Sequence, residues 1–163
     1  MTIHLSIIIP VYNEEKTILK ILERIEKTKL NDFNYEIIII DDGSTDQTPN
    51  LLNENKDKYS SLIKSPKNMG KGHAVIKGLE AANGKYIVFQ DADLEYDPEE
   101  FTNILKIYNK FDADIVYGSR INYKNYTRSH NFLNLIANKC LTLYFNILFN
   151  CTFTDIYSCY LSF

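Results

Sequence analysis

The chain has 163 residues, 45% of them hydrophobic, which is enough for one compact domain with a sizeable core. Its 18 basic and 21 acidic residues are interspersed and give a formal net charge of −3, which excludes the basic field needed for nonspecific nucleic-acid binding. The three cysteines fit neither a Cys-x-x-Cys metal pattern nor a complete disulfide scheme, and no signal-peptide pattern opens the chain, so a cytosolic protein with reduced cysteines is expected.

Apolar segments of strand length alternate with helical patterns along the chain. The strand-like segments are, in order, Leu5–Val11, 35–40, a weaker one at 62–63, 85–89 and 114–117. Helical spacings of three and four link Ile18, Leu22 and Ile25, and then Val75, Leu79 and Ala82. After the fourth strand, Asp97 is expected to cap a helix that begins at Pro98. This order predicts an α/β fold, with a mainly parallel central sheet covered by helices on both faces.

A polar sequence follows four of the predicted strands. These sequences are PVYNEE (10–15), DDGSTD (41–46), QDADLE (90–95) and GSR (118–120). Because ligands of parallel α/β sheets bind beyond the carboxyl ends of the strands, we expect the functional site at this edge.

Asp91 and Asp93 stand two residues apart, directly after a predicted buried strand. Paired carboxylates suit Mg²⁺ or Mn²⁺, and Mg²⁺ usually completes its shell with water and substrate phosphates. The alternative is that the Asp-x-Asp sequence only forms a turn or a helix cap. Glu95 is a candidate third metal contact.

Asp41 and Asp42 are adjacent carboxylates at the end of an isoleucine-rich strand, where they are costly unless they are hydrogen bonded. Asp42 is predicted to accept hydrogen bonds from a nucleobase or a ribose. The alternative is a strand-to-helix turn built on Gly43 with a capping residue from 44–46, which explains the glycine but not the doubled acid.

The loop NMGKGHA (68–74) does not satisfy the phosphate-loop pattern, but its two glycines allow the backbone to approach a ligand closely. Lys71 is predicted to face a phosphate; alternatively, the segment is a plain loop before a helix. Arg120 is the stronger phosphate candidate, because a guanidinium group can engage a phosphate through two hydrogen bonds.

The segment 132–149 has polar residues at every fourth position beside a wide apolar arc. The polar positions are Asn134, Asn138, Thr142 and Asn146. Either this helix packs into a core, or it lies in the membrane interface beside a lipid acceptor. A transmembrane span is disfavoured, because the asparagines and Lys139 fall within a short stretch.

The ordered motifs of the chain resemble those of the family-2 glycosyltransferases with the GT-A fold, and in particular the polyprenyl-phosphate sugar transferases typified by dolichol-phosphate mannose synthases. The motifs are IIIPVYNEE, IIIIDDGSTD, NMGKGHAVIKGLEAANGKYIVFQDADLEYDPEE, DIVYGSR and TDIYSCY, so the resemblance covers nearly the whole chain. It implies one GT-A domain over 1–163, a Rossmann-like three-layer sandwich. Its nucleotide-binding part would be 1–120, and its acceptor and membrane side would be 121–163.

The resemblance also implies roles for individual residues. The residues implied to contact the nucleoside are Pro10, Tyr12, Glu14, Ile40 and Asp42. Those implied to contact the diphosphate and its Mg²⁺ or Mn²⁺ are Asp91, Ala92 and Asp93, and Arg120 is implied to contact the phosphate region. Lys71 is added as a donor contact. Asp91, Asp93 and Arg120 are the predicted catalytic residues, and Asp91, Asp93 and Glu95 the predicted metal ligands.

The implied reaction is inverting transfer of a hexose from a GDP-mannose or UDP-glucose type donor to a polyprenyl or dolichyl phosphate. A phosphate acceptor is already ionised at neutral pH, so no general base is required. The expected partners are the nucleotide sugar, a polyprenyl-phosphate or other lipid acceptor, and a membrane-anchoring subunit, with no nucleic acid. The expected location is peripheral, on the cytosolic face of a membrane.

The chain departs from the family pattern near its end. Leu161 stands where relatives usually have lysine, and relatives continue for several tens of residues, so we expect a C-terminally truncated fold that binds donor better than it turns donor over. The alternatives are an inactive nucleotide-sugar-binding fragment, a sugar nucleotidyltransferase, and a family-2 transferase acting on a saccharide. A dinucleotide-dependent dehydrogenase is excluded, because PVYNEE replaces the required Gly-x-Gly-x-x-Gly.

Overall fold

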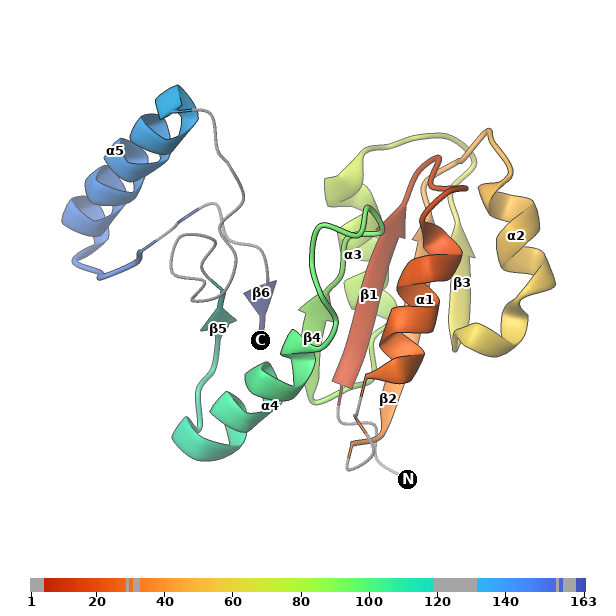
Figure 1. Ribbon diagram of the computed structural model, residues 1–163, viewed down its shortest axis with the longest axis horizontal. Helices are drawn as coiled ribbons and strands as arrows, with labels where there is room; N and C mark the ends of the chain where they lie inside the picture. Colours follow the sequence, from red (N-terminus) through yellow and green to blue (C-terminus); the bar gives the residue numbers. More distant parts are fainter. Residues whose placement is uncertain (1–4, 29, 31–32, 119–131, 155, 157–160) are drawn as a thin grey trace. The chain divides into compact units, whose positions relative to one another are not determined.

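The computed structural model describes residues 5–28, 30, 33–118, 132–154, 156 and 161–163 (Figure 1). The chain divides into two compact units, Met1–Val116 with Ser162–Phe163, and Tyr117–Leu161. Each unit is described by itself. The expected single domain with a division at residue 120 stays a prediction.

The first unit is built on a mainly parallel sheet. The strands of the chain are β1 (Leu5–Val11), β2 (Tyr35–Asp41), β3 (Ser61–Lys64), β4 (Tyr86–Phe89), β5 (Val116–Tyr117) and β6 (Leu161–Ser162), in the sheet order β3-β2-β1-β4-β6-β5. Strand β1 pairs in parallel with both β2 and β4, and β2 pairs in parallel with β3. Only β6 is known to run antiparallel to its described partner, β4. The predicted α/β fold with a mainly parallel sheet is therefore confirmed.

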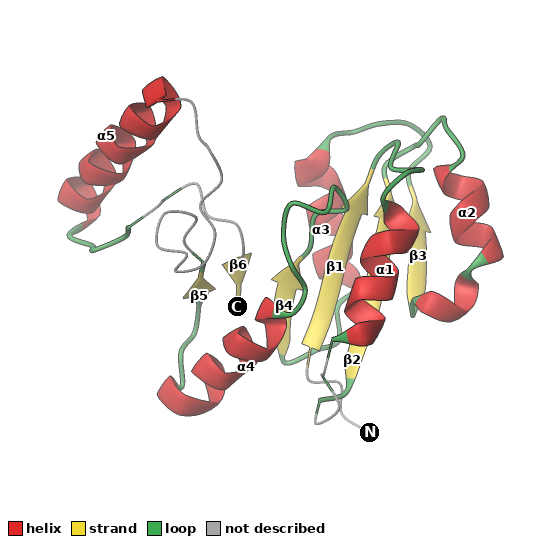
Figure 2. Ribbon diagram, viewed as in Figure 1, coloured by secondary structure: helices red, strands yellow, loops and turns green. Residues whose placement is uncertain are grey.

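The central strands are buried on both faces because they consist of almost unbroken isoleucine runs. Ile7, Ile8 and Ile9 of β1 have no exposed surface, and neither have three successive isoleucines of β2. Such a continuous apolar run is typical of a parallel strand that helices cover on both sides. The helices of this unit are α1 (Ile18–Lys27), α2 (Thr48–Glu54), the short 3₁₀ helix η1 (Lys56–Lys58), α3 (Lys71–Ala81) and α4 (Glu100–Phe111). In Figure 2, α1 passes in front of the sheet and α3 behind it.

Helix α3 lies unusually close to the sheet at Gly78. A Cβ atom at this position would lie 2.3 Å from Cγ2 of Ile8 and 2.9 Å from Cδ1 of Ile40. Ala74, one turn earlier, is fully buried in the same core cluster. Small residues thus allow the helix backbone to rest on β1 and β2, and this packing fixes the start of α3 at the carboxyl edge of the sheet.

The last residues of the chain extend the sheet beside β4. The N–H and C=O of Phe163 exchange hydrogen bonds with those of Ile87, at 3.1 and 2.7 Å. The buried hydroxyl of Ser162 donates to the Ile87 carbonyl at 2.7 Å and accepts from the Tyr108 hydroxyl at 3.1 Å. Burial raises the pKa of Tyr108. The segment that departs from the family motif at Leu161 therefore continues as a paired strand.

The start of α4 differs from the prediction. The helix begins at Glu100, after a turn at Pro98 and Glu99, and not at Pro98. The Asp97 carboxylate still accepts a backbone N–H, from Glu99 at 3.2 Å. The acid therefore stabilises the turn that leads into the helix, as its side-chain chemistry favours, while the regular helix starts later.

The second unit contains α5 (Phe132–Phe149). Two residues of its polar stripe bind the segment that follows the helix. Asn146 exchanges two hydrogen bonds with the backbone of Phe153, at 2.8 and 2.9 Å, and the buried Thr142 hydroxyl accepts from the Ile156 N–H at 3.4 Å. The polar residues at every fourth position therefore lie on the side of α5 that contacts the segment after the helix.

Most of the apolar arc of α5 is exposed. The exposed members are Leu133, Ile136, Leu141, Leu143, Tyr144, Ile147, Leu148 and Phe149. Phe145 is partly buried against Phe149 and Phe153, with ring centroids 4.5 and 5.8 Å away. Among the helices that the structure describes, none has the length and apolar character needed to cross a bilayer.

Candidate functional site

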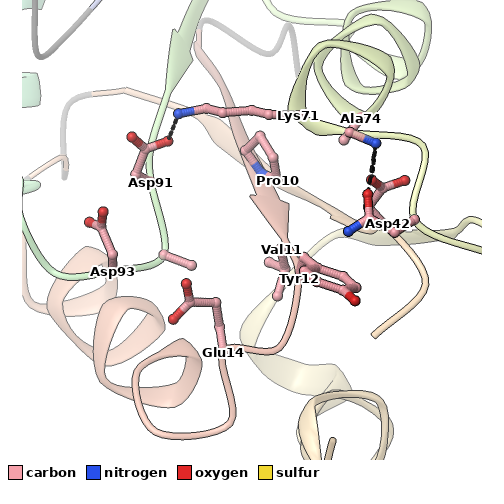
Figure 3. A pocket seen from close by; sticks show the side chains of 12 residues that line it. Pro10, Val11, Tyr12, Glu14, Asp42, Lys71, Ala74, Asp91 and Asp93 are labelled. Atoms are coloured by element: carbon pink, nitrogen blue, oxygen red, sulfur yellow. Dashed lines mark hydrogen bonds and ion pairs between the residues drawn. The ribbon is translucent and has the colours of Figure 1, made fainter. Parts of the chain in front are cut away.

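A pocket of about 320 Å³ opens beyond the carboxyl ends of β1, β2 and β4 (Figure 3). It is lined by Pro10, Val11, Tyr12, Glu14, Asp42, Asn68, Gly70, Lys71, Ala74, Asp91, Ala92 and Asp93. The position at the strand ends is where the sequence predicted the site, and the volume suits a small organic ligand. Of the predicted donor-binding residues that the structure describes, all but Ile40 line this pocket.

Two of the predicted site residues lie outside the pocket lining, and a third is not described. Ile40 is fully buried in the core against α3, and Glu95 does not line the pocket. Arg120 lies outside the described residues. Within the described ranges, no group of three or more histidine, cysteine or acidic side chains is arranged to hold a metal ion. The roles of these three residues stay predictions.

The paired acids Asp91 and Asp93 follow β4 on a loop that is held by hydrogen bonds from a buried side chain. Gln90 is fully buried, and its side-chain amide donates to the Asp91 carbonyl at 2.9 Å and to the Tyr96 carbonyl at 3.4 Å. The Asp93 carboxylate accepts the N–H of Glu95 at 2.9 Å, and the Asp91 carboxylate accepts the Lys71 ammonium at 2.5 Å. These hydrogen bonds therefore hold both carboxylates at the pocket wall.

The acidic side of the pocket has the chemistry of a magnesium or manganese site. In Figure 3 the carboxylates of Asp91, Asp93 and Glu14 gather on one side of the pocket, across from Asp42. Two protein carboxylates are a usual contribution to Mg²⁺, which takes its remaining oxygens from water and phosphate. The residues present thus fit a divalent ion that would be shared between the chain and a bound diphosphate.

Asp42 lines the opposite side of the pocket and has one carboxylate oxygen without a hydrogen-bond partner among the described residues. One of its carboxylate oxygens, Oδ2, accepts the N–H groups of Met69 and Gly70 at 3.0 and 2.7 Å. The other, Oδ1, is buried and has no hydrogen-bond partner among the described residues; Nδ1 of His73 is 3.9 Å away. A buried carboxylate oxygen without a partner is costly, and such an atom in a native structure calls for an explanation.

The doubled acid of the sequence has a structural explanation as well as a functional one. The Asp41 carboxylate accepts the Ser44 N–H at 2.9 Å and so closes the turn after β2. Gly43 in this turn has φ +75°, and a Cβ atom there would lie 2.5 Å from the backbone carbon of Lys67. Asp41 and Gly43 therefore build the turn, which leaves Asp42 to face the pocket.

Reciprocal hydrogen bonds join the loops after β1 and β2, which the sequence did not predict. From the first loop, the N–H groups of Asn13, Glu14 and Glu15 donate to the side chains of Ser44, Thr48 and Asp46 in turn. From the second loop, the Thr45 N–H donates to the Asn13 side chain, and the Gln47 N–H donates to the Glu15 side chain. Burial acts to raise the pKa of Asp46, but hydrogen bonds from Thr48 and Glu15 outweigh it, and the pKa is lowered. Asn13 has φ +56°, a left-handed conformation that asparagine tolerates well. This bracing fixes Tyr12 and Glu14 in the pocket wall.

Comparison with known proteins adds a family match and named relatives. Residues 6–159 match the family model described as Glycosyl transferase family 2. A dolichol-phosphate mannosyltransferase of Pyrococcus furiosus is 38% identical over 116 residues, which are 71% of this chain and 32% of that protein. A dolichyl-phosphate beta-glucosyltransferase of Dictyostelium discoideum is 40% identical over 131 residues, which are 72% of this chain and 40% of that protein.

A solved structure of similar fold was obtained with a donor and a metal ion. The mannosyltransferase from Pyrobaculum calidifontis in complex with GDP-Man and Mn²⁺ has a TM-score of 0.63 and 27% identity, over 72% of this chain and 35% of that one. The chain thus spans between about a third and two fifths of the length of these three proteins.

Proposed function

The chain belongs to glycosyl transferase family 2 and has the GT-A fold, and from this premise we propose that it takes part in transferring a hexose from a nucleotide-diphosphate sugar to a polyprenyl phosphate. The observation that carries the proposal is the two-sided pocket. Asp42, which has one carboxylate oxygen without a hydrogen-bond partner among the described residues, lines one side, and Asp91 and Asp93 line the other. A nucleotide sugar has the matching chemistry, with hydrogen-bond donors on its base and a diphosphate between its ribose and its sugar.

Different residues of the pocket contact different parts of the donor. The Asp42 carboxylate accepts a hydrogen bond from the nucleoside, and the ring of Tyr12, which is 43% exposed, offers a face against which the nucleoside can pack. Asp91 and Asp93 are the residues that would hold Mg²⁺ or Mn²⁺ together with the diphosphate. When bound, this ion neutralises the negative charge that grows on the departing diphosphate. Arg120 is proposed to assist at the phosphates.

The acceptor attacks the anomeric carbon from the side opposite to the leaving diphosphate. This single displacement inverts the anomeric configuration. A phosphate oxygen is already ionised at neutral pH, so the chain needs no base to activate it. The Pyrococcus and Dictyostelium relatives are named for dolichol-phosphate and dolichyl-phosphate transfer, which supports a polyprenyl-phosphate acceptor.

Transfer of labelled sugar tests this proposal directly. We expect label from GDP-mannose or UDP-glucose to enter a lipid product only when polyprenyl phosphate and Mn²⁺ are both present. A parallel reaction with a soluble oligosaccharide acceptor covers the other kind of family-2 transferase. Sugar transfer to the saccharide and not to the lipid would contradict the proposed acceptor, and donor binding without any transfer would favour the nucleotide-sugar-binding fragment.

We also propose that α5 brings the chain to the cytosolic face of a membrane. Its exposed side chains include Leu143, Ile147 and Leu148, which are 61%, 72% and 57% exposed. An apolar surface of this kind, flanked by a polar stripe, suits a helix that lies in the membrane interface.

Replacing Leu143 and Ile147 by serine is expected to abolish co-flotation of the chain with phospholipid vesicles. Donor affinity should change by less than about twofold, because both residues lie outside the donor pocket. The matched control is the double variant Phe111→Ser and Ile115→Ser, which removes two apolar side chains that are 64% and 61% exposed in the first unit. Equal loss of flotation in both double variants, or loss of folding in the α5 variant alone, would contradict a membrane role for this face.

A further inference from the structure

Lys71 places a positive charge on one of the carboxylates that are expected to hold a divalent ion. It is the first residue of α3, and its Nζ lies 2.5 Å from Oδ1 of Asp91 (Figure 3). Asp42 and Asp93, by contrast, each accept a backbone N–H. In the free protein, one of the two acids, Asp91, is therefore already paired with a cation, the ammonium group of Lys71.

The charge of the pocket explains why this cation matters. Of the described residues that line the pocket, four are acidic, Glu14, Asp42, Asp91 and Asp93, and only Lys71 is basic. Carboxylates of like charge repel each other at close range, and they also repel a diphosphate. A diphosphate donor can therefore settle beside the acids only when cations enter with it or turn toward it.

We propose that Lys71 is an internal counter-cation that alternates between Asp91 and the diphosphate of the donor. Without donor, its ammonium group neutralises Asp91. When donor and divalent ion bind together, the ion takes the Asp91 carboxylate and the ammonium group turns to the diphosphate. This inference rests on the proposed function, since it requires a diphosphate donor and an ion held by Asp91 and Asp93.

The ion pair between Lys71 and Asp91 can break and re-form easily. The side chains of Lys71 and Asp91 are 63% and 26% exposed, and exposed ion pairs contribute little net stability because water screens them. The ammonium group sits on a flexible four-carbon stem, so it can move without the backbone. The close packing of α3 on the sheet at Ala74 and Gly78 holds the helix in place meanwhile.

Exchange of the ammonium group couples the binding of metal and donor. In the free protein a divalent ion must displace Lys71 from Asp91, which weakens metal binding. With donor present, the displaced ammonium group gains a new partner, so each ligand favours the other. Removing the ammonium group should therefore have two opposite effects, tighter metal binding without donor and weaker donor binding with metal.

The test compares Lys71→Met with the wild type in two titrations. Binding of Mn²⁺ without nucleotide is followed by the electron paramagnetic resonance signal of free Mn²⁺, and we expect the variant to bind about fivefold more tightly. Binding of UDP and of GDP in saturating Mn²⁺ is followed by calorimetry, and we expect the nucleotide that the wild type prefers to bind about tenfold more weakly to the variant. Lys77→Met is the control, because it removes the same charge from α3 at a lysine that pairs with Glu80 at 2.8 Å.

The two titrations test the two positions of the Lys71 ammonium group separately. Mn²⁺ affinity that is unchanged or lower in Lys71→Met, or raised equally in Lys77→Met, overturns the counter-cation. Nucleotide affinity that is unchanged in Lys71→Met overturns the transfer of the ammonium group to the diphosphate. If neither UDP nor GDP binds to the wild type, the proposed function fails, whereas the Mn²⁺ comparison still decides whether Lys71 neutralises Asp91. Thermal melting of all three proteins shows that they are folded.

Discussion

Replacing Asp93 by asparagine is expected to weaken nucleotide-sugar binding in the presence of Mn²⁺ by about 100-fold. The exchange keeps the side-chain oxygen that accepts the Glu95 N–H, so the loop after β4 should retain its shape. It removes one of the two charges that are proposed to hold the ion, and with it the bridge to the diphosphate. Calorimetric titration with UDP-glucose and GDP-mannose measures the effect.

Two further variants make this result specific. Glu99→Gln removes the same charge at an exposed residue outside the pocket and should leave donor affinity within about twofold of the wild type. Glu95→Gln tests the predicted third metal contact separately, because this residue does not line the pocket. Unchanged donor affinity in Asp93→Asn would show that Asp93 does not hold the ion, whatever Glu95→Gln does.

Glu36→Ala is expected to lower the free energy of unfolding by about 3 kcal/mol. Glu36 is only 7% exposed, and one of its oxygens accepts the Ser6 hydroxyl at 2.6 Å and the Asn83 N–H at 2.7 Å. The Ser6 hydroxyl in turn accepts the Gly84 N–H at 2.8 Å. The carboxylate thus ties β1 and β2 to the turn before β4, and alanine would leave buried donors without a partner.

Thermal melting measures this loss, which corresponds to a decrease in Tm of roughly 10 °C for a chain of this size. Glu36→Gln retains one oxygen acceptor and should cost less, whereas Glu23→Ala, at an exposed position of α1, should change the stability little. Because Glu36 lies near the start of β2, at the end remote from the pocket, the folded fraction should keep its donor affinity. A Tm of Glu36→Ala within about 2 °C of the wild type would show that the network does not stabilise the fold.

The sheet and its functional edge could be predicted because their signals are local. Runs such as the isoleucines of β1 and β2 specify buried parallel strands, and the residues after them must then meet at one edge. For the same reason Tyr12, Asp42, Asp91 and Asp93 were predicted to lie close together, and they all line the pocket. The start of α4 was misplaced by two residues, because cap chemistry at Asp97 is compatible with a turn as well as with a helix start.

What could not be predicted depends on residues far apart in the sequence. The pair of Lys71 and Asp91 joins the start of α3 to the end of β4, and no spacing within either segment indicates it. Asp41 and Asp42 look alike in the sequence, yet one closes a turn and the other faces the pocket. Only the position of the 68–70 loop, which supplies two N–H groups to Asp42, separates their roles.

The pocket at the carboxyl edge of the sheet is proposed to bind a nucleotide sugar through a divalent ion. The most direct measurement is calorimetric titration of the folded chain with UDP-glucose and with GDP-mannose, each in Mn²⁺ and again in excess chelator. We expect at least one of the two donors to bind in Mn²⁺, one molecule per chain, and to lose about 100-fold in affinity when the metal is removed. Binding of neither donor in Mn²⁺, or equal affinity with and without the metal, would contradict this proposal.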